Sequence, residues 1–345
     1  MKLRGCYPDL IYIFRQKRMA WEKEIFNIKT EQDFTKLSLE IFRFQAENNP
    51  VYARYIDLLD VDISAVDSLD KIPFLPIEFF KSHKVTSSDQ AAKVVFTSSG
   101  TTGNLTSRHY VPNLSLYEDS FTKGFEAFYG PVRDYCILAL LPSYLEREGS
   151  SLIYMMEKLI KDSAHPKSGF YLNNHDELIS NIEDLKAQDQ KILLLGVSFA
   201  LLELAENHQL DLGDVVVMET GGMKGRRKEM TREELHGIFT SRLGVDKIHS
   251  EYGMTELLSQ GYSNGDSLFE TPAWMKILIR DAYDPFSYEK SGRSGGVNVI
   301  DLANLYSCSF IETQDLGRIH ADGSFEILGR FDNSDIRGCN LLVSE

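Results

Sequence analysis

A run of seven hydroxyl-rich and glycine-rich residues is the part of the sequence best suited to holding an anion. It reads Thr97-Ser-Ser-Gly-Thr-Thr-Gly103 and directly follows the apolar segment Val94-Val-Phe96. Glycines let backbone N–H groups approach a bound group closely, and hydroxyls supply further donors to phosphate oxygens. The run differs from the G-x-x-x-x-G-K-[ST] phosphate loop, because no lysine follows at the required place. We expect phosphate binding by Thr97, Ser98, Ser99, Gly100, Thr101, Thr102 and Gly103, with an unliganded polar loop as the alternative.

A second segment with chemical potential is Tyr252-Gly-Met-Thr-Glu256. The carboxylate of Glu256 is the kind of oxygen ligand that Mg²⁺ prefers beside a triphosphate. The ring of Tyr252 is suited to stacking on a base. Taken alone, however, a Tyr-Gly turn is equally compatible with a purely structural role.

Two further motifs pair a carboxylate with an arginine. They are Thr313-Gln-Asp-Leu-Gly-Arg318 and Leu328-Gly-Arg-Phe-Asp332. The carboxylate of Asp315 suits two vicinal ribose hydroxyls, and the guanidinium of Arg330 suits a ribose or phosphate contact. A surface ion pair would also explain each of these residues.

The elements that must position these motifs alternate between strands and helices. Apolar runs predict strands at Val94–Phe96, Cys136–Leu141, Ile192–Leu195 and Val215–Met218. Thr231-Arg-Glu-Glu234 has the form of a helix capping box. We therefore predict an α/β architecture with a largely parallel sheet.

The two ends of the chain differ from the middle in their predicted secondary structure. Residues 1–92 are predicted to be mostly helical, with one helix beginning after Thr30 and burying Leu37, Ile41 and Phe44. Beyond residue 265 the pattern is β-rich, with strands predicted at Trp274–Ile279, Gly296–Ile300, Phe310–Thr313 and Phe325–Leu328. The predicted organisation is a helical region (1–92), an α/β nucleotide-binding core (93–265), a smaller β-rich subdomain (266–330) and a short tail (331–345).

Charge and composition exclude several classes of partner. The formal net charge of −14 argues against a protein that covers nucleic acid or anionic membrane. The apolar runs are shorter than the ~18 residues that a membrane-spanning helix needs. The four cysteines (Cys6, Cys136, Cys308 and Cys339) form no C-x-x-C pair, and the N-terminus lacks a signal-peptide pattern. We expect a cytoplasmic protein without a nucleic-acid partner or a membrane span.

The order of these motifs resembles that of the adenylate-forming superfamily of acyl-CoA synthetases and firefly-type luciferases. The similarity is closer to one branch, the acyl-protein synthetases (LuxE, long-chain-fatty-acid–luciferin-component ligases). Six segments resemble that branch in the same order: Phe74–Ile77, Phe96–Gly103, Pro142–Arg147, Ser150–Leu152, Thr220–Gly225 and Arg337–Asn340.

The resemblance implies a role for each motif with ATP and Mg²⁺. The hydroxyl loop would wrap the β- and γ-phosphates, with Arg108 replacing the lysine that most members carry shortly after it. The turn containing Gly221 and Gly222 would pack along the adenine, with Tyr252 and Gly253 near its face. Thr255 and Glu256 would act at the α-phosphate, Glu256 would hold Mg²⁺, and Asp315 and Arg330 would bind the nucleotide.

The resemblance also implies where the activated acyl group goes. Typical members continue into a C-terminal lid domain, and this chain, which ends at Glu345, is expected to lack that domain as the acyl-protein synthetases do. In that branch a cysteine near the C-terminus receives the acyl group as a thioester, which points to Cys339. An inert small hydrophobe remains the alternative for this cysteine.

The expected function is ATP-dependent activation of a long-chain fatty acid, with transfer of the acyl group to an enzyme thiol. An acyl reductase or acyltransferase would be the protein partner. Two rivals remain open. One is a ligase that passes an aryl or short acyl group to CoA or a carrier protein, and the other is a non-catalytic nucleotide-binding scaffold of a reductase complex.

Overall fold

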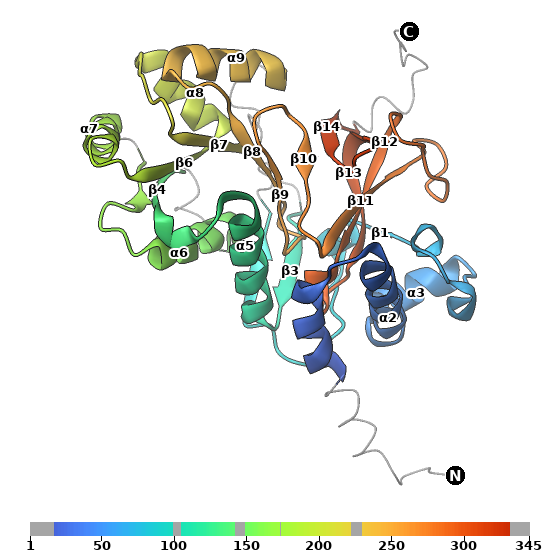
Figure 1. The fold of residues 1–345 in the computed structure, drawn as a ribbon. Helices are drawn as coiled ribbons and strands as arrows, with labels where there is room; N and C mark the ends of the chain where they lie inside the picture. Colours follow the sequence, from blue (N-terminus) through green and yellow to red (C-terminus); the bar gives the residue numbers. More distant parts are fainter. Residues whose placement is uncertain (1–16, 99–104, 142–148, 173, 222–229, 332–345) are drawn as a thin grey trace, which may run out of the picture.

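A single wide sheet connects the elements of this protein (Figure 1). The structure is a computed structural model, and it describes residues 17–98, 105–141, 149–172, 174–221 and 230–331. Within these residues the sheet has twelve strands, eleven of them in the order β11-β12-β13-β14-β10-β9-β8-β7-β6-β4-β5. The twelfth, β1 (Leu75–Pro76), pairs with β13 off that path. A separate two-stranded hairpin is formed by β2 (Val94–Thr97) and β3 (Arg108–Val111).

The middle of the chain forms the parallel half of the sheet. Its strands are β4 (Tyr135–Leu140), β5 (Gly169–Phe170), β6 (Lys191–Val197), β7 (Val216–Thr220) and β8 (His249–Tyr252). Parallel neighbours need crossover connections, and here these contain α6 (Ser151–Ser163), α7 (His175–Lys186), α8 (Ser198–Asn207) and α9 (Arg232–Leu243). Every residue of β4 is buried, which explains its unbroken apolar sequence. The strands predicted from apolar runs are confirmed.

The last third of the chain forms the antiparallel half. Its strands are β9 (Gly261–Ser263), β10 (Phe269–Glu270), β11 (Met275–Arg280), β12 (Ser294–Asp301), β13 (Phe310–Ile319) and β14 (Phe325–Arg330). The four predicted C-terminal strands are confirmed as β11 to β14. Antiparallel pairing of β8 with β9 joins the two halves into one hydrogen-bonded sheet. The largely parallel sheet predicted from sequence is therefore parallel only in its first half, and the subdomain boundary at residue 266 stays a prediction.

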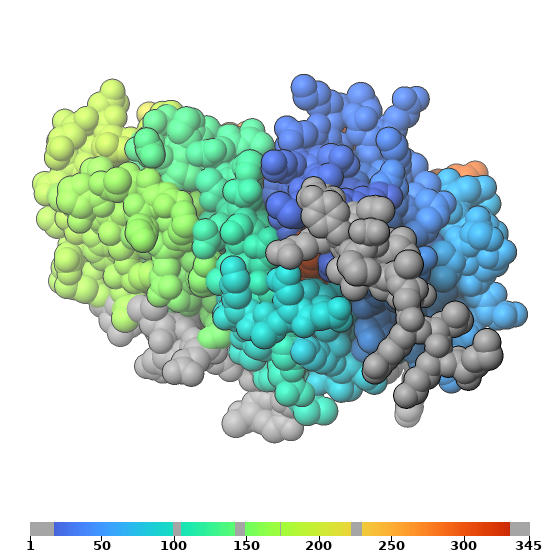
Figure 2. All heavy atoms as spheres, turned by 90° about the horizontal axis from the view of Figure 1, so that it is seen from below, coloured from blue at the N-terminus to red at the C-terminus, as the bar shows by residue number. Residues whose placement is uncertain are grey.

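Further helices and short turns lie in the first half of the chain. They are α2 (Glu31–Asn48), α3 (Pro50–Leu58), α4 (Phe79–Ser82), α5 (Leu114–Tyr129) and the 3₁₀ turns Ile25–Asn27, Ile63–Ala65, Leu69–Lys71 and Val132–Asp134. A further 3₁₀ turn, Leu302–Asn304, follows β12. Seen from below, the described surface combines these blue to green segments with yellow-green residues of the parallel half on the left (Figure 2).

The start of α2 shows why the local sequence signals were reliable. Thr30 and Asp33 form a reciprocal capping box, and Leu37, Ile41 and Phe44 lie buried, as predicted. The predicted capping box of Thr231 and Glu234 likewise begins α9. Capping is a short-range interaction that satisfies the free N–H groups of the first turn, so it can be identified in a few residues of sequence.

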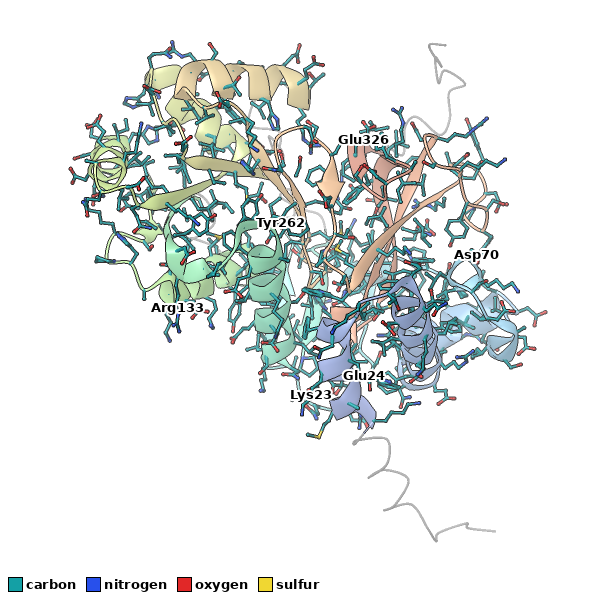
Figure 3. All side chains as sticks on the ribbon, in the orientation of Figure 1. Lys23, Glu24, Asp70, Arg133, Tyr262 and Glu326 are labelled. Carbon is teal, nitrogen blue, oxygen red and sulfur yellow. The ribbon has the colours of Figure 1, made fainter. Side chains whose placement is uncertain are left out.

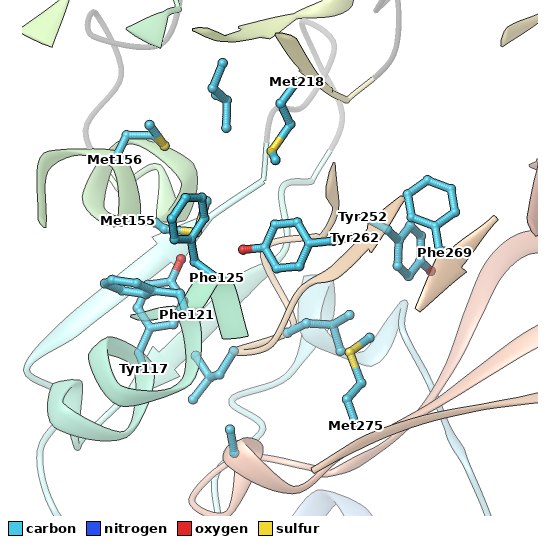
Figure 4. Packing of buried hydrophobic residues seen from close by; sticks show 14 of the residues in the cluster. Tyr117, Phe121, Phe125, Met155, Met156, Met218, Tyr252, Tyr262, Phe269 and Met275 are labelled. Carbon is cyan, nitrogen blue, oxygen red and sulfur yellow. The ribbon is translucent and has the colours of Figure 1, made fainter. Parts of the chain in front are cut away.

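The core between α5, α6 and the sheet is rich in aromatic and methionine side chains (Figure 4). Tyr117 packs edge-on against Phe121 with ring centroids 4.9 Å apart. Met155 and Met156 of α6 are buried in the same cluster. Unbranched methionine chains fill irregular gaps between rings, so this helix layer packs closely on the strands.

A buried carboxylate ties the end of β12 to the segment that precedes β9. Asp301 accepts hydrogen bonds from the backbone N–H of Leu258 at 2.8 Å and of Ser259 at 3.0 Å. It also accepts from the Ser259 hydroxyl and from the N–H of Ala303 at 3.1 Å. Burial raises the pKa of Asp301, while these donors lower it. The segment held here directly follows Glu256.

Replacing this acceptor should destabilise the protein. In Asp301→Asn the amide NH₂ would face backbone donors, so we expect the free energy of unfolding to fall by about 2–4 kcal/mol, measured by urea denaturation. Asp266→Asn is the control, because Asp266 accepts the N–H of Leu268 on an exposed turn. An equal loss in both variants would contradict the importance of the buried network.

Candidate active site

The ends of the hydroxyl loop are held by the β2–β3 hairpin. Thr97 is the last residue of β2, and its N–H donates to the carbonyl of Gly149 at 2.8 Å. The N–H of Ser98 donates to the carbonyl of Ser107 at 3.1 Å, and the N–H of Ser107 donates back to the Ser98 hydroxyl at 2.9 Å. Arg108 pairs with Thr97 in the hairpin register and is exposed. The predicted residues Ser99, Gly100, Thr101, Thr102 and Gly103 lie outside the described residues.

Gly149 supports this loop from the start of α6. Its φ of +83° is a conformation that other residues rarely adopt. A Cβ atom here would lie 3.0 Å from the Thr97 hydroxyl and 3.1 Å from the carbonyl of Val95. The glycine therefore allows the chain to pass directly against β2, which anchors one end of the hydroxyl loop.

The second motif lies against the same hairpin. The buried carboxyl of Glu256 is hydrogen-bonded by the Ser107 hydroxyl. Next to it, the carbonyl of Thr255 accepts a 2.8 Å hydrogen bond from Nδ1 of His109, which must therefore carry the proton. Burial lowers the pKa of His109 to about 4, so this imidazole is neutral near pH 7. The fold thus joins Thr255 and Glu256 to the foot of the hydroxyl loop.

Burial has a chemical consequence for Glu256. Desolvation raises the pKa of its carboxyl, and the Ser107 hydroxyl and the charge of Arg330 partly oppose that shift. A cation placed beside this group would favour its ionised form. Glu256 is therefore suited to hold a divalent ion.

The two C-terminal motifs, which contain Asp315 and Arg330, contact the Tyr252 motif through the carboxylate of Asp315. The Tyr252 hydroxyl donates to Oδ2 of Asp315 at 2.8 Å, and Nε of Arg330 donates to Oδ1 at 3.1 Å. Asp315 and Arg330 are direct partners in the β13–β14 register. The Asp315 side chain is 8% exposed, whereas that of Arg330 is 72% exposed. The arginine therefore reaches inward from the surface to a buried carboxylate.

The environment of Tyr252 differs from the stacking surface that the sequence suggested. Its ring is buried edge-on against Phe325 and Phe269, with centroid distances of 5.6 Å and 6.0 Å. Its hydroxyl is committed to Asp315. In this structure Tyr252 positions the carboxylate, and a role beside the base remains a prediction.

Thr313 explains the spacing of the third motif. Its hydroxyl donates to the carbonyl of Val297 at 2.8 Å and accepts the N–H of Asp315 at 3.1 Å. A threonine two residues before the aspartate thus fixes the backbone that presents the carboxylate.

Two further buried carboxylates lie at the ends of β7 and β8, and sequence reasoning missed both. Glu219 lies 2.8 Å from the Ser198 hydroxyl, 3.5 Å from Nε of Arg232 and 3.7 Å from His236. Burial alone would raise the pKa of Glu219, but His236, Arg232 and Ser198 together lower it. The Ser198 hydroxyl also lies 2.6 Å from the carbonyl of Gly221, so this network holds the turn after β7.

Glu251 is the second missed carboxylate. It is hydrogen-bonded by the Thr220 hydroxyl, and burial raises its pKa to about 7, with the negative charge of Glu219 adding to the shift. A Cβ on Gly253 would lie only 2.3 Å from Glu251 Oε1, so a larger residue here would displace that carboxyl. The available signal was an acidic residue at the end of the segment Lys247-Ile-His-Ser-Glu251, directly before the Tyr252 motif.

The predicted site residues can now be placed. The structure connects Thr97 and Ser98, through Ser107, with Glu256 and its neighbour Thr255, and it connects Tyr252 with Asp315 and Arg330. Gly221 (φ +69°) ends β7, and Gly253 contacts Glu251. Gly222 and Cys339 lie outside the described residues. Among the residues described, no group of three or more histidine, cysteine or acidic side chains could hold a metal by itself, and no helix is long and apolar enough to cross a membrane.

Glu251 makes a testable contribution to pH dependence. Its pKa is about 7 when folded, above the ordinary 4.5, so its stabilising contribution is complete below pH 4.5 and is lost as the pH rises through 7. Glu251→Gln should therefore gain up to about 3 kcal/mol in unfolding free energy relative to the parent between pH 4 and pH 8. Urea denaturation across this range measures the difference.

Glu47→Gln is the matched control, because Glu47 lies exposed on α2. It should leave the pH dependence of stability unchanged. Identical pH profiles for the parent and Glu251→Gln would show that Glu251 does not titrate in this range.

Comparison with known proteins identifies the family of this chain. The family model described as acyl-protein synthetase, LuxE, matches residues 9–345. A curated relative, the long-chain-fatty-acid–luciferin-component ligase of Vibrio harveyi, is 21% identical over 366 residues, covering 98% of this chain and 92% of the relative. The sequence resemblance to the acyl-protein synthetases is confirmed.

Solved structures show the fold. An open conformation of 2-hydroxyisobutyryl-CoA ligase in complex with 2-HIB-AMP and CoA matches with a TM-score of 0.58 at 11% identity, covering 89% of this chain and 77% of that chain. The ATP-bound RpMatB-BxBclM chimera B1 matches with a TM-score of 0.50 at 16% identity over 68% of this chain, which spans only 47% of the chimera's length. The predicted adenylate-forming fold is thus confirmed. The chain belongs to the acyl-protein synthetase (LuxE) family of AMP-forming ligases.

Proposed function

We propose that this protein activates a long-chain fatty acid with ATP as an acyl-adenylate and then transfers the acyl group to its own cysteine thiol. The observation that carries the proposal is the buried Asp315 carboxylate, held by Tyr252 and Arg330 in the same part of the fold as Glu256. The Vibrio harveyi relative is named for a long-chain fatty acid, and two structural relatives contain ATP or an acyl-AMP.

Asp315 binds the ribose in this proposal. A carboxylate offers about four acceptor positions, and the hydroxyl of Tyr252 and Nε of Arg330 use one on each oxygen. One acceptor position per oxygen is left for two vicinal hydroxyls. The two protein donors fix the orientation of the carboxylate before the nucleotide arrives, which reduces the entropy lost on binding.

The phosphates bind at the hydroxyl loop, with Arg108 at its C-terminal foot. Glu256 holds Mg²⁺, an ion that needs one or two carboxylates in addition to phosphate oxygens and water. When bound, Mg²⁺ neutralises phosphate charge. The neutral His109 fixes the carbonyl of Thr255, and the side chain of Asn304 fixes the carbonyl of Glu256 at 2.9 Å. These contacts keep Thr255 and Glu256 in place.

The first step is an in-line displacement. A carboxylate oxygen of the fatty acid attacks the α-phosphorus of ATP, the bond from that phosphorus to the bridging oxygen breaks, and pyrophosphate leaves. The acid and ATP are thereby converted to acyl-AMP and pyrophosphate. Such chemistry depends mainly on positioning and charge neutralisation, which the fixed carboxylates and hydrogen-bond donors support.

The second step transfers the acyl group to sulfur. A thiolate attacks the acyl carbonyl carbon, AMP leaves, and a thioester forms. The two cysteines within the described residues are unsuited to this step, because both are buried and burial raises their thiol pKa, for Cys308 to about 12. Of the two remaining cysteines, Cys6 and Cys339, we propose Cys339 as the acceptor because it lies in the segment Arg337–Asn340 that resembles the acyl-protein synthetases. An acyl reductase or acyltransferase would take the acyl group from it.

Acid-dependent exchange of labelled pyrophosphate into ATP tests the first step. With Mg²⁺ present, we expect exchange with long-chain acids and little with acetate. For Asp315→Asn we expect the KM for ATP to rise about 10- to 100-fold, since lost hydrogen bonds to a charged group are worth about 1.5–3 kcal/mol.

Glu326→Gln provides the matched control on the neighbouring strand β14 (Figure 3), because Glu326 pairs with Arg318 and His320 instead. It should retain the parent KM for ATP. An unchanged KM in Asp315→Asn would contradict the ribose assignment. Tight ATP binding without exchange for any acid would favour the scaffold function.

Covalent labelling tests the second step. Incubation with ATP and a radiolabelled fatty acid should leave hydroxylamine-sensitive label on the denatured protein. Cys339→Ser should lose this label and retain pyrophosphate exchange, whereas Cys6→Ser and Cys308→Ala should keep both. Label that persists in Cys339→Ser would place the thioester elsewhere, and acyl transfer to added CoA without self-labelling would favour the rival ligase.

A further inference from the structure

A cavity of about 240 Å³ is lined by none of the predicted site residues. It is lined by Tyr55 of α3, by Asp70 and Phe74 of the following segment, by Phe286 and Tyr288 of the β11–β12 connection, and by Glu312 of β13. Glu312 is three residues before Asp315 in the same strand. Because successive strand side chains alternate between faces, the cavity and Asp315 lie on opposite faces of β13.

The cavity walls are largely aromatic. The rings of Phe74 and Tyr288 meet edge-on with centroids 6.4 Å apart. Phe286 is 58% exposed, and Tyr283 in the same loop is 85% exposed. The pKa values of Tyr55 and Tyr288 are raised to about 12, chiefly by burial and with a contribution from the charge of Glu312, so both phenols are neutral. The walls therefore offer flat, polarizable faces around a carboxylate.

The charges around the cavity leave an excess of carboxylates. The guanidinium of Arg280 lies 3.5 Å from Glu312, but its hydrogen bonds go to the carbonyls of Val297 and Thr313 and to the side chain of Asn298. The negative charges of Glu78 and Asp315 also act on this one cation. It therefore neutralises only part of the local negative charge.

The rim of the cavity is also acidic. Asp70 is exposed at the outer edge of the molecule (Figure 3). Lys71 also lines the cavity, but its ammonium pairs with Asp67 at 2.9 Å. Residues 54–71 contain five aspartates but only one arginine and one lysine. A ligand entering here meets negative charge at the rim and at Glu312.

We propose that this cavity receives an arginine side chain from a partner protein. A planar guanidinium stacks on aromatic rings and pairs with carboxylates, so it matches both the walls and Glu312 with Asp70. The exposed rings of Tyr283 and Phe286 and the acidic rim extend beyond one side chain, which fits a polypeptide ligand with neighbouring apolar residues. The proposal does not depend on the activity proposed above.

The test uses the full chain with ¹³C-methyl-labelled isoleucine and valine, because Ile72 and Val61 line the cavity. The probes are the peptide acetyl-Leu-Arg-Leu-amide, the same peptide with neutral citrulline in place of arginine, and free arginine amide. We expect the arginine peptide to shift the Ile72 and Val61 methyl signals and to bind at least tenfold more tightly than either other probe.

Single substitutions test which side chains contact the arginine peptide. Asp70→Asn and Phe286→Ala change exposed side chains, so both variants should fold normally, and each should weaken binding of the arginine peptide at least threefold. Asp57→Asn is the control, because Asp57 lies exposed on α3, pairs with Arg54 and does not line the cavity; it should bind normally. Equal binding of the arginine and citrulline peptides, or the absence of shifts at Ile72 and Val61, would overturn the proposal. Arginine amide binding as tightly as the peptide would overturn the partner-protein assignment in favour of a free small cation.

Discussion

The hydrogen bond between Tyr252 and Asp315 is the contact on which the candidate site depends. Strands β8 and β13 are separated in the sheet by β9, β10 and β14. Four strand spacings of about 4.8 Å each would place them about 19 Å apart in a flat sheet. The Tyr252 hydroxyl nevertheless lies 2.8 Å from Asp315, so the sheet must curl strongly here. The rings of Phe269 and Phe325, from β10 and β14, pack against each other and against the ring of Tyr252.

This curvature brings residues from the parallel half and from the antiparallel half of the sheet together at the candidate site. The carboxyl ends of the parallel strands carry the turn after β7 and the segment after β8, where ligands commonly bind in α/β folds. The antiparallel strands carry Asp315 and Arg330 as direct cross-strand partners. Neither half contains the whole set of residues, so the proposed chemistry requires the joint between β8 and β9.

Buried carboxylates are concentrated around that joint, and their environments differ. Glu219 is kept ionised by a histidine, an arginine and a serine, whereas Glu251, on the neighbouring strand, has a threonine as its hydrogen-bond partner and a raised pKa. Asp301 is satisfied largely by backbone donors. Each buried charge or proton costs desolvation energy, so a fold retains such groups where they hold a turn or serve a site.

Local signals were sufficient to predict many elements, including the strand β2 that precedes the hydroxyl loop. The capping residues Thr30 and Thr231, the apolar strand β4 and each of the four motifs depend on residues close together in sequence. Glu219, Glu251 and His109 could not be assigned in this way. Their roles come from partners on other strands and helices, such as Thr220 for Glu251 and Thr255 for His109.

The sequence by itself therefore determined the family, the strand and helix segments, and the residue types that suit a nucleotide. Tertiary structure decided which of these residues meet, that Tyr252 orients Asp315, and that the sheet changes from parallel to antiparallel at β9. The physical reason is the distance along the chain over which each kind of interaction acts. Caps and periodic patterns act over a few residues, whereas sheet curvature and the desolvation of buried acids depend on contacts between segments distant in the chain.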